Sequence, residues 1–582
     1  MGAMLSVINN KFGDLFNKIF NNKKSVIIDI ILIILAVFLF SFLFSHYYYF
    51  LLVDHGRELF LPAQILDGKV PYKDITLIYF PLAYYINALV YKVLGVHLDS
   101  MIIFQTVICS IFSVVYYFLS REFLSRRVSF LLTILIISCC VFSDNDLFGY
   151  VTSYSYARSY GAMSFCACVF FLIKHAKTNK DNYMYLAALL AGLSAAFKFE
   201  YTIIALILML FIVIWKKLKI TDILKLFSAF SVFPLITLGL LFGQGVVLQN
   251  LLHMLEYSVK FSTTPAMAYF LGKIGMYPSE HNFKIFNILS NTSYLLFIVI
   301  VSFLGLKLAQ KFQSSKYLIL LCVFCFVLEY HYIAAGPDYY WLLLPILMTF
   351  IFIYILFSPL RKDMPFIILL FSALLLSQRV FFYMVLSSEG TYSFPLLILG
   401  LLVFIKKVAP PEISNVKIKS LIVFLLIIMI GLYSKLLVIK GQPMEPIVTK
   451  RGTFYAINEH KILYSQLIEY INKNVGENET LLVLPEGNFL NFVTGRGVDL
   501  HCFMMDRLYH DAYGDYGAKN KIAGANSDYI ILHKGLEGDT FGKPYLYDRY
   551  ASPSARYIRE NYKKEKTIIN NSYQLIILKR KN

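Results

Sequence analysis

The sequence predicts an α-helical polytopic membrane protein with a small α/β domain outside the membrane at its C-terminal end. Three observations support this fold class. The 582-residue chain is 58% hydrophobic and only 15% charged, which is unlike a soluble protein of this length. Its apolar runs are about 16 to 22 residues long, enough to cross a hydrocarbon core of roughly 30 Å. From about Gly441 onward the charge density rises and the apolar runs shorten to strand length.

The basic residues indicate membrane topology. The formal net charge is +18, but these residues mostly separate apolar runs, whereas a nucleic-acid-binding protein would cluster them on a polar surface. Every cysteine except Cys502 lies in an apolar stretch, so neither a disulfide framework nor a zinc cluster is expected. The first apolar run, Ser25 to Val53, is too long for the hydrophobic part of a cleavable signal, and we interpret it as a retained first span.

Apolar runs and loop charges together predict about thirteen transmembrane helices, with the N-terminus inside and the C-terminus outside. The run Ile78 to Leu94 is ambiguous because it contains Pro81 and Lys92. If it crossed the membrane, the basic segment 121–127 would lie on the opposite side from the N-terminal lysines, contrary to the positive-inside rule. We therefore place it in the outer interface as an amphipathic helix. The predicted spans are 26–47, 100–119, 128–143, 159–174, 184–198, 200–215, 226–246, 287–306, 317–334, 341–358, 365–383, 394–407 and 420–439.

In this topology every second loop is basic and the intervening outer loops carry the chemistry. Two outer loops are long, Asp54 to Asp99 and Leu248 to Lys284. We expect the functional residues to lie on this outer face. The inner loops hold the basic clusters Arg121/Arg126/Arg127, Lys174/Lys177/Lys180, Lys216/Lys217/Lys219, Lys307/Lys311/Lys316, Arg361/Lys362 and Lys406/Lys407/Lys417/Lys419.

The chain divides into a membrane domain, residues 1–440 with the first outer loop at 54–99, and an outer α/β domain, residues 441–582. In the second domain, strands are predicted at Leu481–Leu484, Tyr529–Leu532 and Leu575–Leu578, with helices between them. Glycines follow the first strand, in the stretch Leu484-Pro485-Glu486-Gly487. They match neither a P-loop nor a dinucleotide fingerprint, so nucleotide binding is not favoured.

The first outer loop begins with Asp54-His55-Gly56-Arg57-Glu58. Asp54 and Arg57 are three residues apart, which places a carboxylate and a guanidinium on one face of a short helix at the level of the lipid headgroups. The carboxylate could take a proton from an acceptor hydroxyl, and the guanidinium could neutralise a phosphate leaving group. The alternative is an interfacial helix cap held by anchoring ion pairs, and spacing alone does not separate the two.

The residues that follow complete a larger pattern. The stretch Leu66–Asp74 is followed by a Pro-Leu-Ala-Tyr-Tyr helix that starts at Pro81 and ends at Gly95, and the next span is closed by the basic segment Ser120–Arg127. In these features the chain resembles the GT-C superfamily of membrane glycosyltransferases. The similarity is greatest to family 39-like members, which include protein O-mannosyltransferases and the lipid A aminoarabinose transferase. The resemblance covers the first 130 residues well and continues more loosely through 192–198 and 339–345.

The resemblance implies a GT-C fold and a location in a bacterial inner membrane. It also implies that Asp54 is the catalytic acidic residue and that Arg57 contacts the donor phosphate. Two departures stand out. The usual Asp-Glu pair is Asp54-His55 here, and Phe80 replaces a lysine that some members carry before the interfacial proline. The second phosphate contact must therefore come from elsewhere, or the donor differs. The candidates are basic residues predicted at the outer face, where ionisable groups are costly and usually functional: Arg158, Lys198, Lys260, Lys273 and Arg379.

Each of these candidates has a structural alternative. Lys198 and Glu200, for example, could form an ion pair whose only role is to stabilise a tight turn. Candidates for positioning the acceptor are His55, Glu58, Asp74, Asp144, Asp146, His253 and His331, together with Glu256 and Asp338. No firm metal site is predicted. Asp54 with Asp144, Asp146 and a histidine would form an oxygen-rich site for a divalent metal ion, but solvated loops with a helix-capping Asp are favoured.

These features predict a glycosyltransferase that moves a hexosyl or pentosyl group from a polyprenyl-phosphate-linked donor to an acceptor hydroxyl, with inversion and with Asp54 as base. Nucleotide sugars are made in the cytoplasm, whereas the predicted carboxylate lies outside, so a lipid carrier must bring the sugar across. The acceptor could be a protein, a glycolipid or a polysaccharide. Two other classes stay open: a transporter or flippase for lipid-linked glycans, which should show broken helices or a repeat, and a noncatalytic membrane assembly factor.

Overall fold

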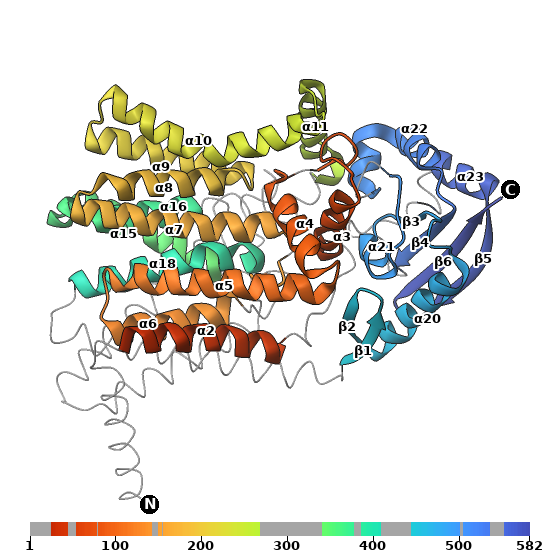
Figure 1. Cartoon of the computed structure of the whole chain (residues 1–582), viewed down its shortest axis with the longest axis horizontal. Coiled ribbons are helices and arrows are strands. Elements are labelled where there is room, and N and C mark those ends of the chain that lie inside the picture. The colour runs from red at the N-terminus through yellow and green to blue at the C-terminus, as the bar shows by residue number, and fades with distance from the viewer. Residues whose placement is uncertain are drawn as a thin grey trace, which may run out of the picture.

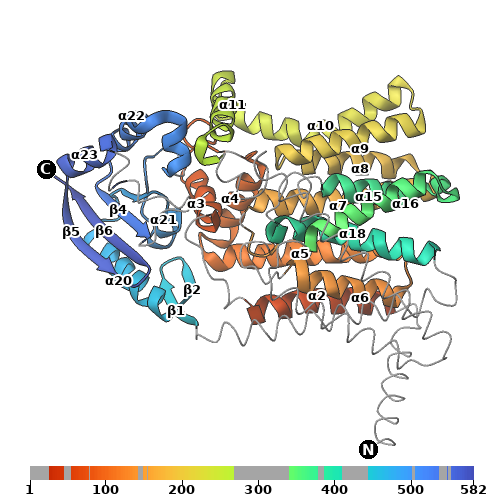
Figure 2. The same ribbon diagram turned by 180° about the vertical axis from the view of Figure 1, so that it is seen from behind.

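The computed structural model describes residues 25–44, 54–77, 79–141, 149–153, 155–267, 340–377, 386–408, 444–500, 505–535, 547 and 552–581. Long helices lie side by side in one bundle, and a small α/β domain covers one end of it (Figure 1). The short helices α3 (Asp54–Leu66) and α4 (Leu82–Leu94) lie between the bundle and this domain, as both views show (Figure 2).

The bundle confirms a multi-pass membrane protein. Six of its described helices are long and apolar enough to span a membrane. Each predicted span inside the described residues is helical, whereas the spans 287–306, 317–334 and 420–439 lie outside them. The bundle helices are α2 (Ser25–Phe44), α5 (Leu98–Arg121), α6 (Arg126–Ile136) continued by the π-helical turn η2 (Ile137–Val141), α7 (Tyr156–Thr178), α8 (Asp181–Ala195), α9 (Phe199–Lys216), α10 (Ile220–Gly243), α15 (Tyr340–Leu356), α16 (Met364–Leu376) after the 3₁₀ turn η5 (Pro359–Lys362), and α18 (Leu386–Val408).

The ends of the helices establish how the chain is threaded. Asp29, at the start of α2, accepts two hydrogen bonds from the Arg126 guanidinium at the start of α6, at 2.6 and 2.8 Å. Tyr156, at the start of α7, instead contacts Glu58 of α3 at the opposite end of the bundle. The chain therefore crosses in α2, stays at one end through α3 and α4, and returns in α5. This confirms that α4 (Leu82–Leu94), in the segment predicted to lie in the interface, does not cross.

Close helix packing depends on a small residue. A Cβ atom built on Gly192 of α8 would lie 1.8 Å from the carbonyl oxygen of Phe230 in α10. Only glycine permits this approach, which is the usual role of small residues between membrane helices. Tight packing of α7, α8 and α10 keeps Tyr156, Arg158 and Lys198 in fixed positions at the end of the bundle that bears α3.

The C-terminal domain is built on a four-stranded sheet in the order β3-β4-β6-β5. Its strands are β3 (Leu481–Leu484), β4 (Tyr529–Gly535), β5 (Tyr562–Ile569) and β6 (Tyr573–Arg580); β3 and β4 are parallel and the other pairs are antiparallel. The three predicted strands are confirmed. The domain also contains a hairpin of β1 (Met444–Thr449) and β2 (Gly452–Ile457) and the helices α20 (Asn458–Asn474), α21 (Asn488–Thr494), α22 (Arg507–Ala525) and α23 (Ser552–Asn561).

This domain docks directly on the first outer loop. Phe489, Leu490 and Phe492 of α21 share one apolar cluster with Leu59 and Phe60 of α3. A second helix of the membrane domain, α11 (Leu248–Ser262) in the other long outer loop, packs against α22. The docking fixes the sheet domain beside α3. The predicted boundary at residues 440 and 441 lies outside the described residues.

Polar contacts hold the same interface at its edges. The backbone N–H of Leu98 donates to the carbonyl of Arg451 at 2.8 Å, and Lys69 pairs with Asp499 at 3.2 Å. The Asp511 carboxylate accepts from the backbone N–H of Ala266 at 2.8 Å. The Lys69–Asp499 pair is exposed and contributes little to stability, so the apolar contacts of α21 with α3 and of α11 with α22 matter more for docking.

Candidate functional site

Asp54 and Arg57 occupy the first turn of α3 and pair with each other. The Arg57 guanidinium lies 3.1 Å from the Asp54 carboxylate, and the two residues are three positions apart in the helix, as the sequence predicts. The Asp54 side chain is 39% exposed, whereas that of Arg57 is only 7% exposed. A carboxylate at a helix N-terminus is stabilised by the free backbone N–H groups there. The arrangement presents an accessible base beside a buried cation.

Glu58 anchors this turn to two neighbouring helices. One carboxylate oxygen accepts from the Tyr84 hydroxyl of α4 at 2.7 Å, and the other accepts from the backbone N–H of Tyr156 at 2.9 Å. The Glu58 side chain is fully buried. Burial raises the pKa of Glu58, while Arg57, Tyr84 and Tyr156 oppose that rise by stabilising the charged form. Glu58 therefore fixes the direction in which Asp54 and Arg57 point.

Replacing Glu58 with alanine is expected to destabilise the protein by about 3 to 5 kcal/mol, because it removes one of the two carboxylates beside the buried Arg57 and leaves the Tyr84 hydroxyl and the Tyr156 N–H without their acceptor. Glu58→Gln, which keeps an acceptor for the Tyr156 N–H, should cost less. Thermal unfolding in detergent measures both variants. Losses near zero for both variants would show that the carboxylate does not hold the turn.

His55 faces the same helix junction. Its Nε2 lies 2.9 Å from the Tyr156 hydroxyl, and the residue is only 3% exposed. Desolvation lowers the pKa of His55 to about 4, so the imidazole is neutral at pH 7 and cannot serve as a cation for phosphate. The geometry makes His55 a second contact between α3 and α7.

The Lys198 ammonium lies against the same aromatic ring as the Arg57 guanidinium. The Arg57 guanidinium lies 5.7 Å from the centre of the Tyr79 ring, and the Lys198 ammonium lies 4.9 Å from the same centre. These distances are within the range of cation–π attraction. Tyr79 therefore brings together two of the residues that the sequence proposes for the donor phosphate, although they are far apart in the chain.

Arg158 joins this group through Glu200. The Glu200 carboxylate lies 3.2 Å from the Lys198 ammonium and 4.0 Å from Arg158 Nε. The Arg158 guanidinium also lies 4.7 Å from the centre of the Tyr392 ring of α18. The structure contains the Lys198–Glu200 ion pair that the structural alternative predicts for the turn between α8 and α9. Because Glu200 also lies near Arg158, it connects Lys198 to Arg158.

Other predicted residues lie apart from this group. Asp74 accepts from the backbone N–H of Val70 at 2.8 Å and so closes the turn 70–75, which matches the solvated-loop alternative. His253 is 65% exposed on α11 and pairs with Glu256 at 3.5 Å. Among the described residues, no cluster of three or more His, Cys, Asp or Glu is suited to a metal ion. The predictions on Asp144, Asp146, Lys273, His331, Asp338 and Arg379 lie outside the described residues.

Sequence reasoning missed Glu486, which the C-terminal domain brings to the site. It follows β3 and precedes α21, the helix that packs on α3. Its Oε1 atom is buried, and within the described part of the chain it has no hydrogen-bond partner. Burial raises the pKa of Glu486 well above its ordinary range; Asp54 and Asp506 raise it further and Arg57 lowers it. Glu486 therefore lies within the electrostatic field of the Asp54–Arg57 pair. The glycine beside it drew attention in the sequence, but nothing local indicated the docking.

Glu486→Gln is expected to stabilise the protein, and more at pH 8 than at pH 5. The raised pKa means that the folded state binds this proton more tightly than the unfolded state. Stability from this group is thus lost as pH rises above its ordinary pKa near 4.5. Glutamine cannot ionise, so the melting temperature should rise by about 2 to 4 °C per kcal/mol relieved.

The control for this experiment is Glu469→Gln, which changes an exposed glutamate on α20. Its melting temperature should differ from that of the wild type by the same small amount at both pH values. If the Glu486→Gln difference is likewise independent of pH, the buried carboxyl is not protonated in the folded protein.

Comparisons with known proteins were made at the level of family, sequence and structure. No family model and no curated protein match the chain. Among solved structures, the apo oligosaccharyltransferase from Archaeoglobus fulgidus overlaps 92% of this chain and 71% of its own, with 11% identity and a TM-score of 0.48. The oligosaccharyltransferase AglB of that organism, in complex with an inhibitory peptide and a dolichol-phosphate, overlaps 86% of this chain and 69% of its own, with 10% identity and a TM-score of 0.44.

ArnT from Cupriavidus metallidurans, bound to undecaprenyl phosphate, overlaps 96% of this chain and 98% of its own, with 10% identity and a TM-score of 0.45. AglB and ArnT are both membrane glycosyltransferases of the GT-C superfamily, the superfamily that the first outer loop of this chain resembles. Identities near 10% and TM-scores below 0.5 do not assign a function to this chain.

Proposed function

We propose that this protein is a GT-C-type glycosyltransferase that moves a sugar from a polyprenyl-phosphate-linked donor to an acceptor hydroxyl on the outer face of the membrane. The observation that carries the proposal is the first turn of α3. There an accessible carboxylate lies 3.1 Å from a buried guanidinium, at the end of the membrane bundle where a lipid headgroup meets water. The basic loops at the other end support placing this end on the outer side of the membrane, and the membrane we propose is a bacterial inner membrane.

The donor phosphate is held by Arg57 and Lys198, which both lie against the ring of Tyr79. Both side chains are nearly buried, 7% and 11% exposed, so their attraction for a phosphate is weakly screened. Arg57 offers a fork that matches phosphate oxygens, and Lys198 offers a point charge. Lys198 takes the role of the lysine that Phe80 replaces, and Arg158 supports it through Glu200.

Asp54 acts on the acceptor. Its carboxylate takes the proton of the acceptor hydroxyl as the oxygen of that hydroxyl forms a bond to the anomeric carbon. The bond between the anomeric carbon and the phosphate oxygen breaks, and the electron pair leaves with the polyprenyl phosphate, whose charge Arg57 and Lys198 neutralise. One displacement of this kind inverts the anomeric configuration. A second carboxylic acid to protonate the leaving group is unnecessary, in contrast to hydrolases.

The C-terminal domain closes the site from the water side. Docking of α21 on α3 brings Glu486 near Asp54, and its raised pKa favours the protonated form, which donates a hydrogen bond. We assign this group to an oxygen of the substrate. The acceptor, whether protein, glycolipid or polysaccharide, then enters between this domain and α3.

A panel of donors tests the proposal. Purified protein in nanodiscs is supplied with hexosyl and pentosyl polyprenyl monophosphates, the corresponding diphosphates, or nucleotide sugars, each with a mixed cell-envelope fraction as acceptor. We expect release of polyprenyl phosphate only from a monophosphate-linked sugar. Turnover of a nucleotide sugar without lipid, or transfer of intact lipid-linked sugar between leaflets of liposomes without cleavage, would contradict the proposal, and the second result would favour the transporter class.

A further inference from the structure

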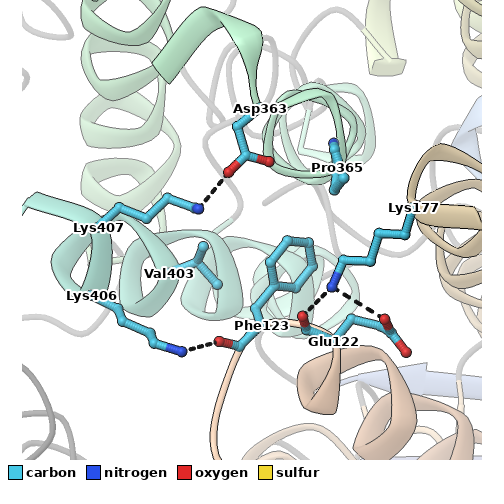
Figure 3. A pocket seen from close by; sticks show the side chains of 8 residues that line it. All are labelled: Glu122, Phe123, Lys177, Asp363, Pro365, Val403, Lys406 and Lys407. Carbon is cyan, nitrogen blue, oxygen red and sulfur yellow. Dashed lines mark hydrogen bonds and ion pairs between the residues drawn. The ribbon is translucent and has the colours of Figure 1, made fainter. Parts of the chain in front are cut away.

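A cavity of about 200 Å³ lies at the end of the bundle farthest from Asp54. Helix α7 runs from Tyr156, beside Glu58, to the region of Lys177 at the cavity, and at 1.5 Å per residue these two points are roughly 30 Å apart. The cavity therefore lies at the opposite membrane surface from the proposed catalytic site. Its lining residues are Glu122, Phe123, Lys177, Asp363, Pro365, Val403, Lys406 and Lys407 (Figure 3).

Lysines outnumber carboxylates around this cavity. Glu122 is shared by Lys174 at 2.6 Å and Lys177 at 3.2 Å, so one negative charge faces two positive charges. Asp363 pairs with Lys407. The ammonium of Lys406 donates to the carbonyl oxygen of Phe123 at 2.6 Å, and no described carboxylate pairs with it. The local balance is therefore positive by two charges.

The lining is also amphipathic. In Figure 3 the lysines extend from opposite sides toward Phe123, whose ring lies between them with Val403 nearby. Pro365 continues this apolar side onto α16. Because a water molecule takes about 30 Å³ in the liquid, the cavity has room for a phosphate group with part of its ester. A free anion would use only the lysines, whereas a lipid would use both sides.

We propose that this cavity binds the phosphate group of an anionic phospholipid from the inner leaflet. Ammonium groups bind phosphate as point charges, and basic pockets between transmembrane helices on the cytoplasmic side are suited to lipid headgroups. The lipid connects the ends of α5, α7, α16 and α18, which contribute the lining residues. The proposal is independent of the glycosyltransferase reaction, so each can fail without the other.

The test uses the full chain in phosphatidylcholine nanodiscs with increasing phosphatidylglycerol. Lipid binding is measured by native mass spectrometry and stability by thermal unfolding. Phosphatidylglycerol is expected to bind and to raise the melting temperature, whereas inorganic phosphate at the same concentration should not. Lys406→Ala should weaken phosphatidylglycerol binding about fivefold. Lys362→Ala, which removes an exposed lysine beside the cavity but outside its lining, should bind as the wild type does.

A second variant separates binding from damage to the fold. Glu122→Gln removes the carboxylate that neutralises Lys174 and Lys177, and it should strengthen phosphatidylglycerol binding. Three results would overturn the proposal: no preference of the wild type for phosphatidylglycerol over phosphatidylcholine, equal binding by the Lys406→Ala and Lys362→Ala variants, or full stabilisation by inorganic phosphate, which would make the cavity a site for a free anion.

Discussion

Asp54→Asn is expected to lower kcat by about 10² to 10⁴-fold, the usual contribution of a positioned general base. Asparagine has nearly the same shape as aspartate and keeps an oxygen near Arg57, so α3 should keep its structure. Donor affinity should change little, because the phosphate is held by Arg57 and Lys198 rather than by the carboxylate. Initial rates at saturating donor measure kcat, and binding of labelled donor measures affinity.

The matched control is Asp99→Asn, which alters a carboxylate that is 61% exposed in the first turn of α5 on the same outer side. It removes the same charge from the same region and should leave kcat within a factor of about two, since surface changes of this kind are usually small. Equal rates for Asp54→Asn and the wild type would exclude Asp54 as the base.

Arg57→Ala is expected to lower kcat/KM by about 10² to 10³-fold, the loss found when one preorganised group that stabilises developing charge is removed. The effect should appear in donor affinity as well as in kcat, because Arg57 contacts the phosphate before and during bond breaking. Arg57→Lys keeps the charge and loses the forked geometry, so it should recover only part of the activity.

Arg57 also pairs with Asp54 and Glu58, so its loss could act through stability. Melting temperatures of the two Arg57 variants separate this effect from catalysis. Lys69→Ala serves as the control, because Lys69 is a 41% exposed cation of the same outer loop that pairs with Asp499. If Arg57→Ala binds donor and turns it over as Lys69→Ala does, the phosphate is held elsewhere.

The sequence predicts those contacts of the site that join residues close together in the chain. The i, i+3 spacing of Asp54 and Arg57 determines their pairing in any helix, and the structure shows that pair at 3.1 Å. The contacts of Glu58 could not be predicted, because its acceptor role depends on Tyr84 in α4 and on the N–H of Tyr156 in another span. The sequence therefore identified Glu58 as a candidate. It did not show whether Glu58 positions the acceptor substrate or positions the helix α3.

The same limit applies to residues that meet only in the folded chain. Arg57 and Lys198 both lie within cation–π distance of Tyr79, and no periodicity in the sequence pairs those two cations. Glu486 reaches α3 through the apolar docking of α21, whose residues look like ordinary core positions. Charge and hydrophobicity located the outer face of the membrane domain, but only packing shows which of its ionisable groups converge.

In the C-terminal domain, the sequence does not predict strands β1, β2 and β5, and the reasons are physical. Strand β5 (Tyr562–Ile569) lies at the sheet edge and exposes Lys563 to Lys566, a charged pattern that protects edges from aggregation and hides the strand from hydrophobic periodicity. The hairpin of β1 and β2 contains Pro446 opposite Tyr455, and a proline inside an apolar run argues against a strand unless that strand lies at an edge.

The most direct test of the central claim is a quantitative balance of products from a radiolabelled polyprenyl-phosphate sugar in nanodiscs, with wild type and Asp54→Asn side by side. Free polyprenyl phosphate and glycosylated acceptor are both counted, and bound donor is measured in parallel. The proposed function predicts equal amounts of the two products from the wild type, formed only with acceptor present, and formation of both products at least about 100-fold slower by Asp54→Asn despite normal donor binding. Equal product yields from the two proteins, or no release of polyprenyl phosphate by the wild type from any donor, would contradict it.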